Sequence, residues 1–419
     1  MLPLVQLVAF EGPDRYSFVG GLATRMNDLA EALVDRGYTV RHLFVGDPER
    51  PHVEERAGGK LLLERWGQWI SAYHPRDVYD GEMGKWRDFG RTVPPHLVDD
   101  VIIPAAKAGQ RTVVLFEDWQ TADAAVGTAL LLTMGERRSA ASLFWNANNT
   151  YGFGAVDFAS LEQATTITTV SRFMRAALAD AGVDAAVLPN GIAERWLRPV
   201  APADVRAVRA AFGDRPTLVK VARFDPDKRW DWAIDAVAAM KADGLRPRFV
   251  VRGSRADYAD VVWRRARRRG LSVDDLRLPA EAPVPAVTKA IAASSGDVVH
   301  LDFFVSEPPL RALYAAADGV LANSSKEPFG LVGLEVMACG GIAYLGRTGE
   351  DYAVPYGNCV VVQTGDPREL GSHLAFLAER KDVASRIRTE GQTTAKRFAW
   401  PRIVDALEVT WDAAARLGK

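Results

Sequence analysis

The chain has 419 residues, more than one hydrophobic core usually supports, so we expect two domains. Its 52 lysine and arginine residues balance 53 aspartate and glutamate residues, which gives no reason to expect nucleic acid as a partner. Its two cysteines, Cys339 and Cys359, have no metal-ligand spacing and do not support a disulfide framework. No apolar run reaches the roughly 18 residues of a membrane span, and the first residues lack a basic cleavable leader. We therefore expect no transmembrane segment and a cytoplasmic location.

The N-terminal part of the chain alternates apolar strands with amphipathic helices. A strand over 2–10 leads to Gly20-Gly21, and a helix that ends at Gly37 precedes a second strand over 39–45. This order predicts a doubly wound sheet. Gly20 and Gly21 would let the backbone approach a ligand closely, although a tight turn explains the pair equally well.

Residues 60–100 differ from the regular units around them, because six aromatic residues are scattered among charged ones. Aromatic faces stack on sugar rings while charged neighbours bind hydroxyl groups. We interpret this segment, with Trp86 in it, as a candidate acceptor lip. A small satellite core under a long loop is the alternative.

Two further strands, over 112–116 and 142–145, run into polar residues. Open α/β sheets bind their ligands at the carboxyl ends of strands, so these positions are candidate binding residues. They are Glu117, Asp118, Trp119 and Asn148. A strand over 164–171, a helix over 172–181 and a short strand over 186–192 follow, and we expect a hinge around 196–202.

The second half of the chain opens with a strand near 217–221, and the loop after it carries Arg223 and Lys228. Arginine grips phosphate with two donors and lysine adds a point charge, so the pair is a candidate phosphate site. Two surface cations paired with Asp225 and Asp227 are the alternative. These aspartates also form an Asp-x-Asp pattern, but so short a pattern is common by chance, and we expect no metal.

Further elements of the second half are a helix over 232–240, a strand over 248–252 before Gly253, and a strand over 298–304. A helix over 308–317 and terminal helices over 385–396 and 401–414 complete the pattern. The basic run Arg264–Arg269 is typical of a solvated helix face, with a membrane-surface helix as the alternative.

The most informative stretch is 323–341, where a strand over 320–322 runs into a turn with Pro328 and Gly330. We expect a helix that begins between 329 and 331 and ends at Gly340-Gly341. The free N–H groups of its first turn favour an anion. Glu327 and Glu335 bracket this turn and could accept hydrogen bonds from hydroxyls. A nucleotide-diphosphate sugar fits this layout, and an acidic pair at a helix start is the alternative.

These residues carry a family resemblance. Glu327-Pro328-Phe329-Gly330-Leu331 with a second glutamate eight positions on resembles the E-x7-E signature of retaining glycosyltransferases of family 4, in the glycogen-synthase-like superfamily. The Arg223 and Lys228 spacing resembles the Arg-x4-Lys box of that family. The resemblance implies the GT-B fold, with two Rossmann-like domains facing across a cleft. It places an acceptor domain at 1–197, with helix 402–419 packing back on it, and a nucleotide-sugar domain at 198–401.

The resemblance also implies roles for individual residues. The catalytic residues would be Arg223, Lys228 and Glu327. Donor contacts would come from Gly20, Gly21, Gly253, Phe329, Gly330, Leu331, Val332 and Glu335. Acceptor contacts would come from Glu117, Asp118, Trp119, Asn148 and Trp86. Glycogen and starch synthases carry histidines where this chain has Glu117 and Asn148, which leaves the acceptor open.

The expected activity is transfer of a hexosyl group, with retention, from a UDP-, ADP- or GDP-sugar to a hydroxyl acceptor such as a saccharide or a small polar molecule. No cofactor and no metal are expected. The alternatives are glucan elongation and a nucleotide-sugar-binding protein without catalysis. A phosphorylase would need a Schiff-base lysine and a far longer chain. The sequence leaves the base, the sugar, the acceptor and the oligomeric state open.

Overall fold

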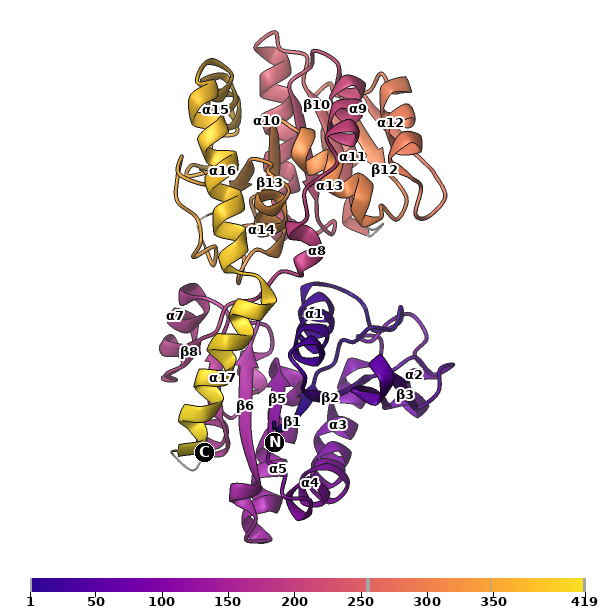
Figure 1. Cartoon of the computed structure of the whole chain (residues 1–419). Helices are drawn as coiled ribbons and strands as arrows, with labels where there is room; N and C mark the ends of the chain where they lie inside the picture. Colours follow the sequence, from indigo (N-terminus) through magenta and orange to yellow (C-terminus); the bar gives the residue numbers. More distant parts are fainter. Residues whose placement is uncertain (1, 254–256, 347, 417–419) are drawn as a thin grey trace. The chain divides into compact units, whose positions relative to one another are not determined.

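The computed structural model describes residues 2–253, 257–346 and 348–416. Contacts divide the chain into two compact units. Unit 1 comprises Met1–Ala193 and Phe398–Lys419, and unit 2 comprises Glu194–Arg397. Each unit is a sheet of mainly parallel strands with helices on both faces (Figure 1). The predicted α/β class, doubly wound in both units, is confirmed.

The sheet of unit 1 has the strand order β3-β4-β2-β1-β5-β6-β7-β8. Its strands are β1 (Leu4–Val8), β2 (Thr39–Val45), β3 (Val53–Arg56), β4 (Leu61–Trp66), β5 (Thr112–Glu117), β6 (Ala141–Ala147), β7 (Thr166–Thr169) and β8 (Ala186–Val187). All neighbours pair in parallel except β3 and β4, which are antiparallel. Every residue of β1 and β5 is buried, as expected for strands covered on both faces.

The helices of unit 1 include one from the far end of the chain. They are α1 (Gly21–Asp35), α2 (Gln68–Ser71), α3 (Glu82–His96), α4 (Ile103–Lys107), α5 (Ala122–Met134), α6 (Phe158–Ala164), α7 (Arg172–Asp180) and α17 (Trp400–Arg416), with the short turns η1 (Ala57–Gly59), η2 (Leu97–Ile102), η3 (Trp119–Thr121), η4 (Arg138–Ala140) and η5 (Phe153–Ala155). Helix α17, yellow in Figure 1, buries Trp400 and Trp411 in the same core as β1 and α1. The N–H of Ile192 donates to the carbonyl of Phe398 (2.8 Å), and the N–H of Trp400 donates to that of Ile192 (3.2 Å). The last helix therefore completes the first core.

The interpretation of residues 60–100 as irregular was wrong. β4 supplies a strand of the sheet, and α3 runs on through the π-helical turn η2 into α4. Pro94 and Pro95 lie inside α3, and each removes an N–H donor from the helical ladder shortly before the π turn. Phe89 is fully buried, whereas Trp69 and Tyr73 are exposed. The aromatic residues therefore serve several environments rather than one lip.

The sheet of unit 2 has the strand order β11-β12-β10-β9-β13-β14-β15, and its described strand pairs are all parallel. Its strands are β9 (Thr217–Val221), β10 (Arg248–Arg252), β11 (Val273–Leu276), β12 (Val298–Leu301), β13 (Gly319–Ala322), β14 (Ala343–Leu345) and β15 (Val360–Val361). β9 and β13 are central neighbours, so the loops that follow them leave the same edge of the sheet. This edge is where an open α/β sheet keeps its ligands.

Helices cover both faces of this sheet. They are α8 (Glu194–Leu197), α9 (Pro202–Phe212), α10 (Trp230–Ala242), α11 (Asp257–Arg268), α12 (Val284–Ala293), α13 (Glu307–Ala316), α14 (Leu331–Ala338), α15 (Arg368–Glu379) and α16 (Lys381–Arg397), with the turn η6 (Pro226–Lys228). Within the predicted hinge, Trp196 is buried and its ring stacks on Tyr314 of α13, with centroids 6.2 Å apart. Trp196 thus belongs to the packing of unit 2.

Candidate active site

Two loops at the carboxyl edge of the unit 2 sheet carry the predicted catalytic residues. The β9 loop (residues 222–229) holds Arg223, which is exposed, and Lys228. The β13 loop (residues 323–330) holds Glu327, whose carboxylate accepts a hydrogen bond from the Lys228 ammonium at 2.9 Å. Both of these side chains are about a fifth exposed, at 23% and 22%. The pair is therefore accessible to a ligand while each group already has a partner.

The two aspartates of the β9 loop help to order the backbone, Asp225 through its carboxylate and Asp227 through its main-chain carbonyl. The carboxylate of Asp225 accepts from the N–H of Asp227 (2.9 Å) and caps the turn η6. The carbonyl of Asp227 accepts from the N–H of Ser325 at 2.8 Å, which ties the β9 loop to the β13 loop. Asp225 therefore has a local structural role, in keeping with setting the Asp-x-Asp pattern aside.

Helix α14 begins as predicted, at Leu331. Gly330 precedes it with φ of +86°, in the left-handed region that favours glycine. A Cβ added there would lie 2.8 Å from Cγ of Glu350 and 2.9 Å from the hydroxyl of Tyr352. The N–H groups of Leu331 and Val332 lie in the first turn, where a helix has no internal acceptor for them, and both residues are partly exposed. Glu335 follows one turn later and is partly buried.

Two other predicted donor contacts have packing roles. Phe329 is buried, with its ring edge-on to Tyr352 at 5.9 Å between centroids. A Cβ on Gly253 would lie 2.7 Å from the ring of Phe224 and 2.8 Å from the carbonyl of Ala222. The side chain of Phe329 is buried in this packing and Gly253 has no side chain, so any contact they make with a donor would come from the main chain.

Sequence reasoning missed the segment that holds Glu327 in place. The N–H of Glu327 donates to the hydroxyl of Thr348 (2.9 Å), and its carbonyl accepts from the N–H of Gly349 (2.8 Å). The Thr348 hydroxyl in turn donates to Glu350 at 3.2 Å. Burial, with a further contribution from nearby Glu327, raises the pKa of the Glu350 carboxyl to about 7. This segment follows the short strand β14, which carried no clear pattern in the sequence.

A second missed residue is Lys220, on β9. Its side chain is 1% exposed, and its ammonium donates to the amide oxygen of Asn323 at 2.8 Å. The only sign of it in the sequence is a lysine inside an otherwise apolar strand. A fully buried lysine is uncommon unless it is paired.

In unit 1, a carboxylate of the protein itself binds at the N-terminus of α1, beside Gly20 and Gly21. The carboxylate of Glu11 accepts from the N–H groups of Gly20 (2.9 Å) and Ala23 (3.0 Å) and from the hydroxyl of Tyr79 (2.6 Å). Glu11 is 4% exposed and was missed in the sequence. A Cβ added to Gly20 or Gly21 would meet no atom within 4 Å, so these glycines border open space. A ligand could approach there, but the first-turn donors Gly20 and Ala23 are engaged by Glu11.

β5 and β6 are paired neighbours and end side by side, but Glu117 differs from its predicted role as an acceptor contact. Its side chain is 0% exposed and pairs with Arg25 of α1 at 3.1 Å. The side-chain amides of Asn146 (2.9 Å) and Asn148 (2.6 Å) also donate to it. The carboxylate is enclosed by these partners, so Glu117 holds α1, β5 and β6 together and its side chain is not presented to an acceptor.

Asp118 is held in an unusual conformation. Its φ is +64°, a sterically costly value for a residue other than glycine. Its carboxylate accepts from the N–H of Asn148 (2.7 Å) and from the side-chain amide of Asn149 (2.8 Å). Burial raises the pKa of this carboxyl to about 7, with smaller contributions from the nearby Glu117 and Glu11 carboxylates. Backbone strain beside a buried, raised-pKa carboxyl is characteristic of functional sites.

The two tryptophans predicted to contact an acceptor lie together. The rings of Trp86 on α3 and Trp119 on η3 have centroids 5.3 Å apart, and both residues are partly exposed. The predicted aromatic surface in unit 1 therefore reduces to this pair. Trp119 of this pair directly follows Asp118 in the sequence.

Comparison with known proteins agrees with this geometry. Residues 203–394 match the model of the family described as "Glycosyl transferases group 1". The matched stretch covers a little under half of the chain and lies within unit 2, so unit 2 is similar to the group 1 glycosyltransferases. The chain is 30% identical over 240 residues to a D-inositol 3-phosphate glycosyltransferase of Saccharomonospora viridis, a match that covers 55% of this chain and 50% of the relative. The chain thus spans about half the length of the curated relatives it matches.

Solved structures show that this chain has the GT-B fold. The catalytic domain of starch synthase IV from Arabidopsis thaliana, bound to ADP and acarbose, superposes with a TM-score of 0.69 at 17% identity and covers 99% of this chain and 100% of its own. The Anabaena HepE protein in complex with UDP-glucose has a TM-score of 0.62 at 18% identity, with 98% and 100% covered. The predicted resemblance to GT-B glycosyltransferases is therefore confirmed.

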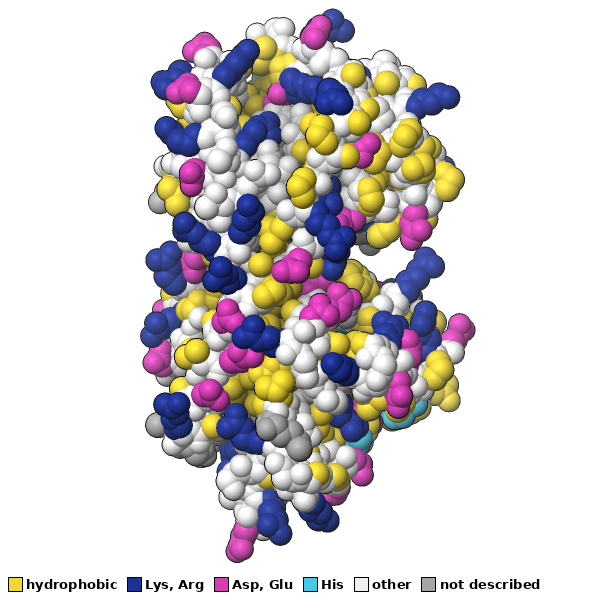
Figure 2. All heavy atoms as spheres, in the orientation of Figure 1, with side chains coloured by type: hydrophobic (Ala, Val, Ile, Leu, Met, Phe, Trp, Pro, Cys, Tyr) yellow, Lys and Arg dark blue, Asp and Glu magenta, His cyan; other side chains and the backbone are white. Residues whose placement is uncertain are grey.

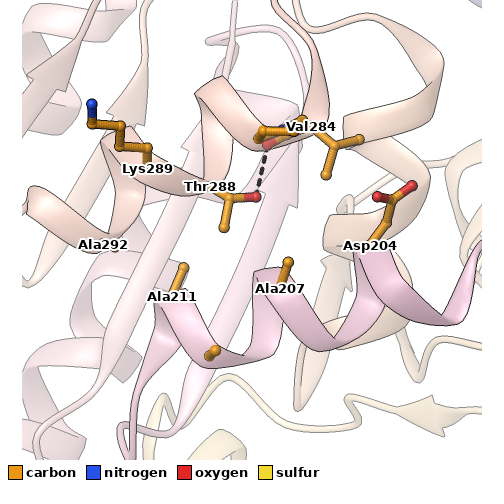
Figure 3. A pocket seen from close by; sticks show the side chains of 9 residues that line it. Asp204, Ala207, Ala211, Val284, Thr288, Lys289 and Ala292 are labelled. Carbon is orange, nitrogen blue, oxygen red and sulfur yellow. Dashed lines mark hydrogen bonds between the residues drawn. The ribbon is translucent and has the colours of Figure 1, made fainter.

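An apolar groove of about 450 Å³ lies between α9 and α12 of unit 2 (Figure 3). Ala207, Ala211 and Val284 are among its lining residues, and the hydroxyl of Thr288 is turned back to the carbonyl of Val284 at 2.7 Å. Hydrophobic side chains also gather over these helices in the space-filling view (Figure 2). The groove contains none of the predicted site residues and presents few polar groups.

The basic run on α11 forms one wall of a second groove, of about 500 Å³. Trp263 and Ala266 of this helix are buried, while Arg265 and Arg269 both pair with Asp235 of α10, at 2.5 and 2.9 Å. This arrangement agrees with a solvated helix face. Among the residues that the structure describes, none forms a helix long and apolar enough to cross a membrane.

Proposed function

We propose that the protein transfers a hexosyl group from a nucleotide-diphosphate sugar to a hydroxyl acceptor with retention at the anomeric carbon. The observation that carries the proposal is the Lys228–Glu327 pair beside the start of α14. A cation, a carboxylate and a helix N-terminus lie at one strand edge of unit 2, with Arg223 on the same loop. Such a set matches a ligand that has a diphosphate next to a sugar.

In this reaction, the bond between the anomeric carbon and the diphosphate oxygen breaks, and a bond to the acceptor oxygen forms on the same face. Negative charge grows on the departing diphosphate, where Arg223, Lys228 and the first-turn N–H groups of α14 would stabilise it. Positive charge grows on the sugar, and the carboxylate of Glu327 would orient and stabilise it. The acceptor proton would pass to the leaving phosphate. Because the cations and the helix N-terminus supply positive charge, we propose that no metal is required.

The comparisons suggest where to look for substrates. The Saccharomonospora viridis relative is named for D-inositol 3-phosphate, and the two solved structures contain UDP-glucose and ADP. UDP- and ADP-sugars are therefore the first donors to test, and an inositol phosphate the first acceptor. Glucan elongation is the alternative activity that the starch synthase likeness suggests. A binding protein without catalysis is the other alternative.

The test is nucleotide release by purified protein from UDP-, ADP- and GDP-hexoses, with inositol phosphate, glucan and simple sugars as acceptors. Arg223→Ala and Lys228→Ala should each lower kcat on the order of 10²-fold, as expected when one charge-stabilising group is lost. Glu327→Gln should also lower kcat. The affinity for the nucleotide product should change much less in all three variants, because these groups act on charge that develops in the transition state.

The chain offers a matched control at the other end of α10. Lys241 pairs with Asp297 at 2.8 Å, much as Lys228 pairs with Glu327, but it lies at the last turn of the helix. Lys241→Ala should leave kcat unchanged. A rise in KM with intact kcat in the Arg223 and Lys228 variants would contradict their catalytic role, and nucleotide binding without turnover across the panel would favour the non-catalytic alternative.

A further inference from the structure

A buried lysine lies directly below the proposed catalytic loops. Lys220, the fourth residue of β9, is 1% exposed. Its ammonium donates to the side-chain oxygen of Asn323 (2.8 Å) and, at 3.5 Å, to the carbonyl of Leu321. Both partners are neutral, whereas a buried cation is usually balanced by a carboxylate. Keeping a lysine here is costly for folding, so a role in the site is worth testing.

Lys220 contacts the roots of both loops. Asn323 is the first residue of the β13 loop, and it is fully buried. On the other side the ammonium lies over the ring of Trp230, 5.3 Å from its centroid, and Trp230 directly follows the β9 loop as the first residue of α10. The indole N–H of Trp230 donates to the carbonyl of Arg223 at 2.8 Å. One ammonium therefore links the start of one loop to the end of the other.

The rest of the connection between these loops lies nearer the surface. The N–H of Ser325 donates to the carbonyl of Asp227, and Lys228 pairs with Glu327. A diphosphate that engages Lys228 would compete with the second of these contacts. The buried link through Lys220 is shielded from such competition, because the ligand cannot reach it.

We propose that Lys220 is a positioning residue of the transferase, whose ammonium holds the β9 and β13 loops in register so that Arg223, Lys228 and Glu327 act on the same donor. This inference rests on the proposed function. It assigns to Lys220 no contact with the substrate.

The charge of Lys220 is sensitive to its surroundings. Burial, together with the nearby cations Lys228 and Arg229 of the β9 loop, lowers its pKa to about 7, and Glu327 of the β13 loop opposes this shift. The residues that face it from α10 and β10, Trp230 and Val251, carry no charge. An anionic diphosphate bound near Lys228 would favour the protonated ammonium. Binding of nucleotide and protonation of Lys220 should therefore strengthen each other.

The experiment compares wild type with Lys220→Met, whose unbranched side chain is one atom shorter and carries no charge. In wild type, kcat/KM should fall as the pH rises above about 7, and binding of UDP at pH 7.5 should take up protons, read as a calorimetric heat that depends on the buffer. In Lys220→Met, kcat should be at least about tenfold lower, the alkaline fall near pH 7 should be absent, and the proton uptake should disappear.

Two further variants separate positioning from folding. Arg248, at the amino end of β10, is a buried cation whose terminal nitrogens donate to carbonyl oxygens, including those of Ala211 (2.7 Å) and Ser294 (2.9 Å). Arg248→Met should lower the unfolding midpoint but leave kcat and the pH profile unchanged. Asn323→Asp places a carboxylate beside the ammonium, which raises its pKa, so the alkaline limb should move to higher pH by more than about one unit.

The outcomes are distinct. A Lys220→Met protein with the kcat and pH profile of wild type overturns the inference. If Lys220→Met fails to fold, the inference is overturned when the alkaline fall of kcat/KM in Asn323→Asp occurs at the same pH as in wild type. If wild type transfers no sugar but binds UDP, the proposed function fails, and the proton uptake alone decides whether Lys220 is linked to the nucleotide. A wild-type protein that neither transfers sugar nor binds UDP, ADP or GDP overturns both the proposed function and the inference about Lys220.

Discussion

The Arg25–Glu117 ion pair predicts a large and specific loss of stability in unit 1. Arg25 is 3% exposed and Glu117 is 0% exposed, so Arg25→Met would leave a carboxylate with no cation in a site closed to water. Breaking a buried pair by removing one partner typically costs about 3–5 kcal/mol, and the two asparagine amides that remain on Glu117 favour the lower half of that range. Unit 1 should unfold at a much lower urea concentration.

The assay is hydrogen exchange of β5 and β6 peptides against rising urea, with β9 peptides as the internal reference for unit 2. The double variant Arg25→Met, Glu117→Gln should be more stable than Arg25→Met alone, because the uncompensated charge is gone. Arg36→Met, which breaks an exposed pair with Glu408 in the same unit, should change little. The reasoning is refuted if Arg25→Met and Arg36→Met destabilise unit 1 equally. It is also refuted if the stability losses of Arg25→Met and Glu117→Gln add up in the double variant.

Four other outcomes are expected. Because the folded-state pKa of Asp118 is about 7 against an ordinary 3.8, its carboxyl contributes stability that is complete below pH 4 and is lost as the pH rises through 7. The urea midpoint of wild type minus that of Asp118→Asn should therefore decrease as the pH rises from 4 to 7. A difference that does not change with pH would contradict the raised pKa. Gly330→Ala should lower the free energy of unfolding by about 1–2 kcal/mol or more and weaken nucleotide binding, because φ is +86° and the added Cβ meets Glu350. A urea titration measures the first effect and calorimetry the second. Glu335→Ala should weaken nucleotide affinity and leave kcat at saturation largely intact, as measured by calorimetry and steady-state kinetics. Turnover should persist in excess chelator, and loss of activity with rescue by magnesium or manganese would overturn metal independence.

Regular, strongly patterned features could be predicted from the sequence. The start of α14 followed from Pro328 and Gly330, whose backbone preferences act locally, and the strands β5 and β9 followed from apolar runs bounded by polar residues. Each of these signals lies within a few residues of the feature it predicts. The same local reading placed Glu117 and Asn148 at strand ends, and the structure shows that the two side chains meet there.

Features that depend on distant partners could not be predicted in this way. Glu117 looked like a ligand contact, since nothing near it in sequence shows that Arg25 lies across from it. Glu11 belongs to no motif in the sequence, although its carboxylate accepts hydrogen bonds from the start of α1. The regular structure of residues 60–100 was hidden because charged residues and two prolines obscure the helical period of α3.

The hydrogen bonds that join Ile192 to Phe398 and Trp400 have a consequence for biosynthesis. Unit 2 is one uninterrupted stretch, Glu194–Arg397, inserted between two parts of unit 1. The ribosome makes the chain from its N-terminus, so all of unit 2 is synthesised while unit 1 still lacks α17, with Trp400 and Trp411 missing from its core. The unit that starts first is therefore the last to be finished, and a nascent chain stopped before residue 398 would expose the apolar surface that α17 covers.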